Sequence, residues 1–144
     1  MTLGSPYDAR MGTWSAEPFG NDTAADFAWE LDGQKRWGVV RAALEQATKA
    51  GPDMGSDIAV TAIAAAEVVA HGLGRPTQTD AYTESVEAFV GRARKPNRRL
   101  TEQARRAVTA AADPAGELAE LWAESDGAEW DEAIARLVAR LGAD

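Results

Sequence analysis

The chain has 144 residues, enough for one ordinary domain with a hydrophobic core of its own. It contains no cysteine, which excludes disulfides, thiolate nucleophiles and metal sites built on cysteine. The net charge of -8 argues against nucleic acid as a partner, and no apolar stretch reaches the roughly 20 residues that span a bilayer. We therefore expect a cytoplasmic globular protein that does not contact the membrane.

The beginning of the chain changes from an unpatterned to a helical segment. Residues 1–10 are polar, and we expect them to be a disordered leader before a single helical domain at 11–142. The first helix is expected to start at Asn21 or Asp22, because either side chain can cap free N–H groups. It is expected to end at Gly33.

Two further helices follow, and the second of them is the most apolar segment of the chain. One is expected over residues 34–50, with a buried face that consists of Trp37, Val40, Leu44 and Ala47. After the turn at 51–55, Ser56 is expected to open a helix that runs to about His71 and is apolar nearly all round. A helix of this kind should be central, covered by the others.

Four more helices are expected in the second half of the chain. Apolar periodicity predicts helices over residues 80–93 and 98–112. The Asp-Pro pair at 113–114 predicts the start of a sixth helix, because Asp is a good cap and Pro suits the first helical position. Asp126 and Glu129 have the spacing of a capping box and predict the start of the last helix.

These elements predict an all-α fold. We expect a compact bundle of about six to seven short helices around a central apolar helix at about residues 56–71, preceded by an extended N-terminal segment. The short connections favour antiparallel neighbours.

The run MGTWSAEPFGNDTAADF, Met11 to Phe27, places aromatic residues in a segment that is not helical at its start. We expect Trp14 and Phe19 to anchor this segment on the helical core, over Trp29, while Asn21 or Asp22 caps the first helix. On that interpretation Trp14→Ala destabilises the fold by roughly 3–5 kcal/mol if the ring is fully buried.

Three stretches resemble the bacterial family catalogued as domain of unknown function 4259. They are MGTWSAEPFGNDTAADF at 11–27, AAAEVVAHGLGRP at 64–76 and ELAELWAESDGAEWDEAIARLVARL at 117–141. The resemblance implies a small cytoplasmic bacterial domain that begins at Met11 and has no established activity, so no catalytic residue is carried over. Members often have Asp where this chain has Gly20, so a role for an acid at that position is not carried over either.

Two groups of polar residues are candidates for chemistry. Asp22, Asp26 and Glu30 stand four residues apart on one helix face, where carboxylates can bind a divalent cation. Glu67 and His71 are also four apart and can act as an acid–base pair or half of a metal site. We favour a solvated helix face for the first group and a charge-assisted structural pair for the second, and we expect no catalytic residue, metal or cofactor.

Basic residues are concentrated between Arg92 and Arg106, where seven of the 15 Lys and Arg residues lie. Such a run can bind phosphate, nucleic acid or an acidic partner, with Arg98 and Arg99 as candidate contacts. No aromatic residue interleaves with it, so we favour pairing with the acidic last third of the chain over nucleic-acid binding.

Trp29 lies about 100° or more from the stripe of Phe27 and Leu31 on the first helix. Either the preceding segment covers this indole, or Trp29 is exposed and contacts a partner together with Asp26 and Glu30.

The functional hypothesis is a non-catalytic protein–protein interaction module with an unknown protein partner, in its sharper form an immunity-like or inhibitor-like protein. No P-loop, G-x-S-x-G, HExxH or dinucleotide motif is present. Two alternatives stay open: a ligand-binding or metal-dependent enzyme using Asp22, Asp26, Glu67 and His71, and nucleic-acid binding through the basic run. Homo-oligomerisation is also open.

Overall fold

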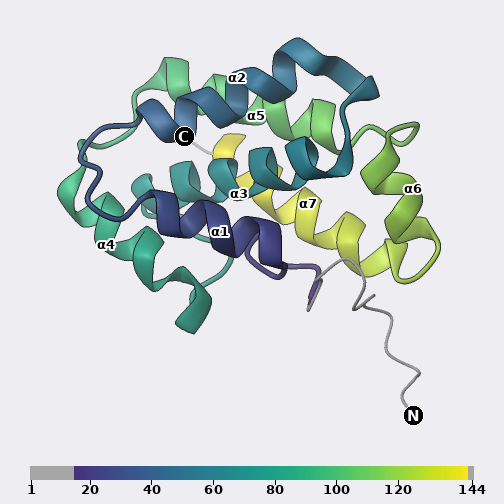
Figure 1. Cartoon of the computed structure of the whole chain (residues 1–144), viewed down its shortest axis with the longest axis horizontal. Coiled ribbons are helices and arrows are strands. Elements are labelled where there is room, and N and C mark those ends of the chain that lie inside the picture. The colour runs from purple at the N-terminus through teal and green to yellow at the C-terminus, as the bar shows by residue number, and fades with distance from the viewer. Residues whose placement is uncertain (1–14, 143–144) are drawn as a thin grey trace.

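The computed structural model describes residues 15–142, which form helices joined by turns and short loops (Figure 1). The described α-helices are α1 (Asp22–Glu30), α2 (Gly38–Ala50), α3 (Ser56–Gly72), α4 (Glu84–Arg92), α5 (Arg98–Ala111), α6 (Glu117–Ala123) and α7 (Gly127–Gly142), with two 3-10 turns, η3 (Gly51–Asp53) and η4 (Ala81–Thr83). This part of the chain contains no strand, which confirms the predicted all-α class. The predicted leader and Trp14 lie outside the described residues.

The centre of the bundle is α3, as its composition predicts. Residues 62–71 of this helix are all buried, and the small alanine side chains among them let neighbouring helices approach closely. The most extensive contacts of α3 are with α5 and α2, and α1, α4, α6 and α7 cover its remaining sides (Figure 1). None of the helices described is both long and apolar enough to cross a membrane.

Polar side chains mark several helix starts. Asn21 caps α1, because its Oδ1 accepts a hydrogen bond of 2.8 Å from the N–H of Ala24. Asn97 caps α5 in the same way, with 2.8 Å to the N–H of Leu100. Asp126 accepts from the N–H three residues later, at 3.1 Å, at the start of α7. Of the two caps expected for α1, the structure uses Asn21.

The predicted start of α2 at residue 34 is wrong, and the helix begins at Gly38. Gly33 has a φ of 80°, and the chain after it stays irregular up to Trp37. The indole Nε1 of Trp37 donates a hydrogen bond of 2.7 Å to the carbonyl oxygen of Arg94. The indole also packs edge-on against the ring of Phe89, with 5.0 Å between the two ring centroids. These contacts hold Trp37 at the N-cap, one residue before the helix.

The predicted start of α6 at 113–114 is also wrong, and the helix begins at Glu117. Asp113 instead closes a turn, since its Oδ1 accepts from the N–H of Ala115 at 2.9 Å and its carbonyl oxygen accepts from Gly116 at 2.8 Å. The carboxylate of Glu117 accepts a hydrogen bond of 2.6 Å from the N–H of Ser56. An acid of α6 thus supplies an acceptor at the start of α3.

Candidate functional site

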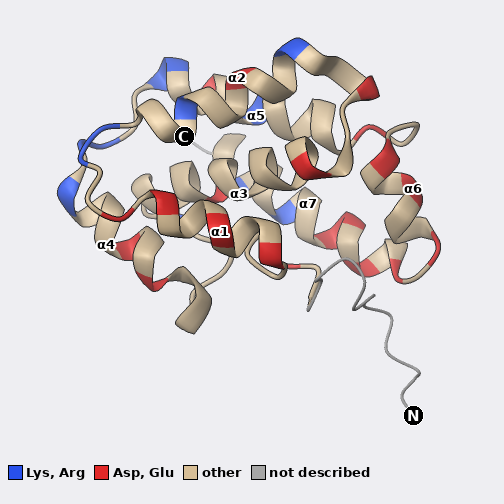
Figure 2. Ribbon diagram, viewed as in Figure 1, with Lys and Arg blue, Asp and Glu red and all other residues tan. Residues whose placement is uncertain are grey.

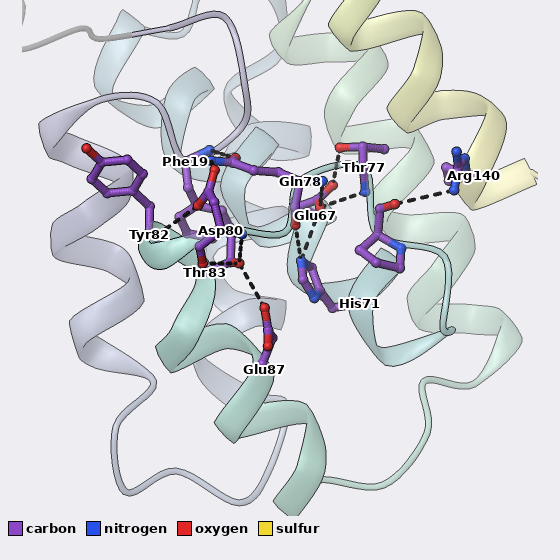
Figure 3. A network of polar contacts seen from close by, with 11 residues as sticks. Phe19, Glu67, His71, Thr77, Gln78, Asp80, Tyr82, Thr83, Glu87 and Arg140 are labelled. Carbon is purple, nitrogen blue, oxygen red and sulfur yellow. Dashed lines mark hydrogen bonds and ion pairs between the residues drawn. The ribbon is translucent and has the colours of Figure 1, made fainter.

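Glu67 is a carboxylate in the middle of the core, with no exposed surface. Its Oε1 accepts a hydrogen bond of 2.7 Å from the hydroxyl of Thr77. Its Oε2 accepts from the backbone N–H groups of Thr77 and Gln78, each at 2.9 Å (Figure 3). Both oxygens are therefore satisfied by the loop that follows α3, which compensates the cost of burying the charge.

His71 lies one helical turn after Glu67 and completes this arrangement. Its Nε2 is 3.2 Å from Oε2 of Glu67 and 2.9 Å from the carbonyl oxygen of Gln78 (Figure 3). Both neighbours are hydrogen-bond acceptors, so Nε2 carries the proton. The ring is buried beside Glu67, as the prediction of a structural pair requires. The structure adds that both residues bind the loop that follows α3.

Gln78 extends the network to the beginning of the described chain. Its Oε1 accepts a hydrogen bond of 2.7 Å from the backbone N–H of Phe19, and its Nε2 donates to Asp80 at 3.0 Å. Asp80 in turn caps η4 by accepting from the N–H of Tyr82 at 2.9 Å (Figure 3). Through Gln78, the buried carboxylate of Glu67 is linked to the segment before α1.

Sequence reasoning missed Gln78 and Thr77. The available signal was a carboxylate in an otherwise apolar helix, which requires nearby donors. The segment TQTD, 77–80, comes directly after the Gly- and Pro-rich end of that helix. It supplies the Thr77 hydroxyl and the backbone N–H groups of Thr77 and Gln78.

The segment before α1 is a closed loop. The N–H of Ser15 donates to the carbonyl oxygen of Gly20 at 3.1 Å, and the N–H of Gly20 donates to that of Glu17 at 2.9 Å. Gly20 is buried so tightly that a Cβ atom there would lie 2.6 Å from the carbonyl oxygen of Ser15. Phe19, expected to be an anchor, has no exposed surface.

Glu17 lies in this loop and is a second carboxylate that the fold partly buries. Its Oε1 lies 3.4 Å from the guanidinium of Arg136, whereas its Oε2 is buried with no hydrogen-bond partner in the described part of the chain. Burial raises the pKa of Glu17 above its ordinary value. Arg136 opposes this shift, and the negative charges of Glu67, Asp80 and Glu129 add to it.

The space beside Glu17 is too small to be a ligand site. It is lined in part by Trp122 and Trp130, whose rings stack with centroids 6.4 Å apart. Its volume of about 20 Å³ is close to that of a single water. This hollow therefore offers no room for a substrate.

The outer face of α1 is open to solvent. Trp29 is 72 % exposed, and Asp26 and Glu30 beside it are exposed as well. The described part of the preceding segment, residues 15–20, does not cover Trp29, because Phe19 turns into the core instead. Three of the residues predicted to contact a partner thus share one free helix face.

The four residues of the enzyme alternative do not form one site. Asp22 and Asp26 are exposed on α1, whereas Glu67 and His71 are buried on α3. Among the described residues, no group of three or more acidic or histidine side chains is placed to hold a metal ion.

The basic run is divided among several surroundings. Arg92 is used by the fold, since its guanidinium donates at 3.0 Å to the carbonyl oxygens of Leu31 and Gln34, just after α1. Within residues 15–142, the other six basic residues of the run form no ion pair, so the expected pairing with the acidic last third is wrong. Figure 2 shows that α1 and α6 carry acids and no bases, whereas α2 and α5 carry bases.

Arg98 and Arg99 are both exposed in the first turn of α5, but they face different hollows. Arg99 lines a hollow with Arg41 of α2, and Arg98 lines another with Leu141 of α7. Because α1 and α5 pack on different sides of α3 (Figure 1), these arginines do not belong to the surface around Trp29.

Comparison with known proteins gives a family. The model described as Domain of unknown function (DUF4259) matches residues 12–133, a range that includes the loop before α1, the Glu67 network and the first part of α7. No curated protein and no solved structure matches the chain.

Proposed function

The chain belongs to the DUF4259 family, and we propose that it acts by binding another protein through the outer face of α1. The observation that carries this proposal is the exposure of Trp29, 72 % of whose surface is open to solvent. Tryptophan is the residue most enriched among interface hot spots, since one indole can bury a large area in a partner's pocket.

The acids around Trp29 define the chemistry of the partner. Asp22, Asp26 and Glu30 are exposed on α1, and Asp32 follows it. An apolar indole surrounded by carboxylates is complementary to a partner whose surface is basic and contains an apolar pocket. The overall charge of -8 would also accelerate encounter with a basic protein.

This chemistry supports the sharper hypothesis of an immunity-like or inhibitor-like role in the cytoplasm. A small acidic protein that covers a basic active surface needs no catalytic group of its own. The buried pair that a reaction would require, Glu67 and His71, is occupied by the chain's own loop.

The test is site-specific photocrosslinking in cells, with the crosslinker in place of Glu30, which is exposed beside Trp29 and leaves the indole in place. The matched control carries it at Glu84, an exposed position at the start of α4. We expect a single basic protein to be captured at stoichiometric level from position 30 and not from position 84. Purified partner should bind Trp29→Ala at least tenfold more weakly than wild type, as expected for a hot spot of about 2 kcal/mol.

Three results would contradict the proposal. Equal capture at both positions would indicate non-specific contact. Unchanged affinity of Trp29→Ala for the captured protein would place the contact elsewhere. Capture of a second copy of the chain, with Trp29→Ala shifting the sedimentation coefficient to that of a monomer, would assign the face to a homodimer.

A further inference from the structure

Three exposed arginines, Arg41, Arg99 and Arg106, line one hollow between α2 and α5. Its volume is about 450 Å³, within the range of roughly 300–1,000 Å³ typical of small-molecule sites. Arg41 and Glu45 line it from α2, and Arg99, Gln103 and Arg106 line it from α5. Residues 99, 103 and 106 follow the spacing i, i+4 and i+7, which places them on one face of the helix.

These three arginines differ from those that stabilise the fold. Arg92 donates to backbone carbonyl groups, and Arg136 pairs with Glu17. By contrast, Arg41, Arg99 and Arg106 are exposed and form no ion pair with any residue in the described part of the chain. In a protein with eight more acids than bases, three guanidinium groups and one carboxylate, that of Glu45, line this hollow and give it a net positive charge.

We propose that the hollow between α2 and α5 binds a small phosphorylated compound that also carries hydroxyl groups. Guanidinium groups match the oxygens of phosphate in geometry and charge, and arginines from two helices can grip one phosphate from two sides. Gln103 and the amide of Asn97, whose Oδ1 already caps α5, add neutral donors at the same hollow.

The carboxylate of Glu45 in this hollow favours a small ligand over a nucleic acid. Its exposed carboxylate lines the same hollow, where it can accept hydrogen bonds from the hydroxyl groups of a ligand such as a sugar phosphate. A nucleic acid would bring more phosphates toward this carboxylate and toward a molecule of net charge -8. Among residues 15–142, no aromatic side chain lines the hollow to stack on a base.

The test uses the full chain with glucose 6-phosphate, inorganic phosphate and glucose as probes in isothermal titration calorimetry. We expect glucose 6-phosphate to bind with 1:1 stoichiometry and more tightly than phosphate, and glucose not to bind. Arg99→Gln and Arg41→Gln should each weaken binding about tenfold, as expected for the loss of a charge-assisted bidentate contact.

The matched control is Arg98→Gln, which removes the same charge from the adjacent residue on a different side of α5. It should change affinity by no more than about twofold, because a charge outside the site acts only through the screened field. Unchanged melting temperatures will show that the exposed substitutions leave the fold intact.

Three outcomes overturn the proposal. The first is no binding of glucose 6-phosphate at millimolar concentration in low salt. The second is equal weakening by Arg98→Gln and Arg99→Gln, which would indicate a diffuse field. The third is a DNA oligonucleotide or an acidic peptide that displaces the sugar phosphate and binds more tightly, with the same dependence on Arg41 and Arg99.

Discussion

Glu67 and Glu17 are two carboxylates that the fold draws inward, and their surroundings are opposite. Glu67 has no exposed surface, and both of its oxygens accept hydrogen bonds from the loop after α3. Glu17 is half-buried, with one oxygen in a weak ion pair and the other without a partner among the described residues. The backbone donors around Glu67 offset the cost of removing its charge from water, and the buried oxygen of Glu17 has no such donor among the described residues.

The largest effect is expected from Glu67→Ala. The substitution leaves the N–H groups of Thr77 and Gln78 without an acceptor and opens a cavity in the core. We expect a loss of about 3–5 kcal/mol in the free energy of unfolding, measured by urea denaturation. Glu67→Gln keeps the side-chain volume and one acceptor oxygen, so it should lower the free energy of unfolding by less than Glu67→Ala does. An equal loss would mean that the charge of Glu67, and not its volume, determines the stability.

The next effect concerns the loop that carries Glu17. Gly20→Ala places a Cβ atom 2.6 Å from the carbonyl oxygen of Ser15, so the backbone of the loop must shift. We expect a loss of about 1–3 kcal/mol in the same measurement. Gly55→Ala is a matched control, because a Cβ atom at that position meets nothing within 4 Å. Equal stability of the two variants would show that the closed loop is not required.

A smaller loss of stability is expected at Gln78, which joins the Glu67 network to the loop before α1. Gln78→Ala removes the acceptor of the Phe19 N–H but leaves the backbone of residue 78 free to donate to Glu67. The unsatisfied N–H should cost about 1–2 kcal/mol. Hydrogen exchange should accelerate at Phe19 and leave the centre of α3 protected. Exchange that accelerates equally in both places would mean that the network is a single cooperative unit.

The fold followed from sequence because helical periodicity and caps are local signals. The mostly apolar run at 58–70 identified the central helix, and the pair Asn21 and Asp22 marked the start of the first, where the structure uses Asn21 as the cap. The failures at Trp37 and Asp113 have different causes. Asp113 forms a local turn with Ala115 and Gly116 in place of the helix cap that the Asp-Pro pair predicts. Trp37 is fixed by the carbonyl group of Arg94, 57 residues away, which no local pattern reveals.

The candidate site was less predictable for the same reason. The i, i+4 spacing correctly brought Glu67 and His71 together, but their hydrogen-bond partner Gln78 comes from a loop without periodicity. Exposure of Trp29 depends on where the preceding segment folds. The prediction for Trp14→Ala stays a prediction, since that residue lies outside the described range.

The smallest expected effect is a gain in stability rather than a loss. It concerns Glu17 and tests most directly whether this carboxylate differs from Glu67. Glu17→Gln removes a charge whose burial is only partly compensated by Arg136, so we expect the variant to be more stable than wild type at pH 7. The gain should be below about 1 kcal/mol, because a third of the side chain is exposed and its interactions are screened.

The pH dependence of this gain identifies its cause. Burial raises the pKa of Glu17 in the folded state, so the unfolded chain gives up the proton of this group at lower pH than the folded chain does. Ionised Glu17 therefore destabilises the folded protein at pH values above its raised pKa. This destabilisation disappears as the pH falls below that pKa to the ordinary pKa of a glutamate. The melting temperatures of wild type and Glu17→Gln should differ at pH 7 and should become equal as the pH is lowered.

Arg136→Gln leaves the negative charge of Glu17 in place and removes its cationic partner. This variant should be less stable than wild type at pH 7. If Glu17→Gln is instead the less stable protein at neutral pH, the ion pair outweighs desolvation, and the two carboxylates are more alike than their surroundings indicate.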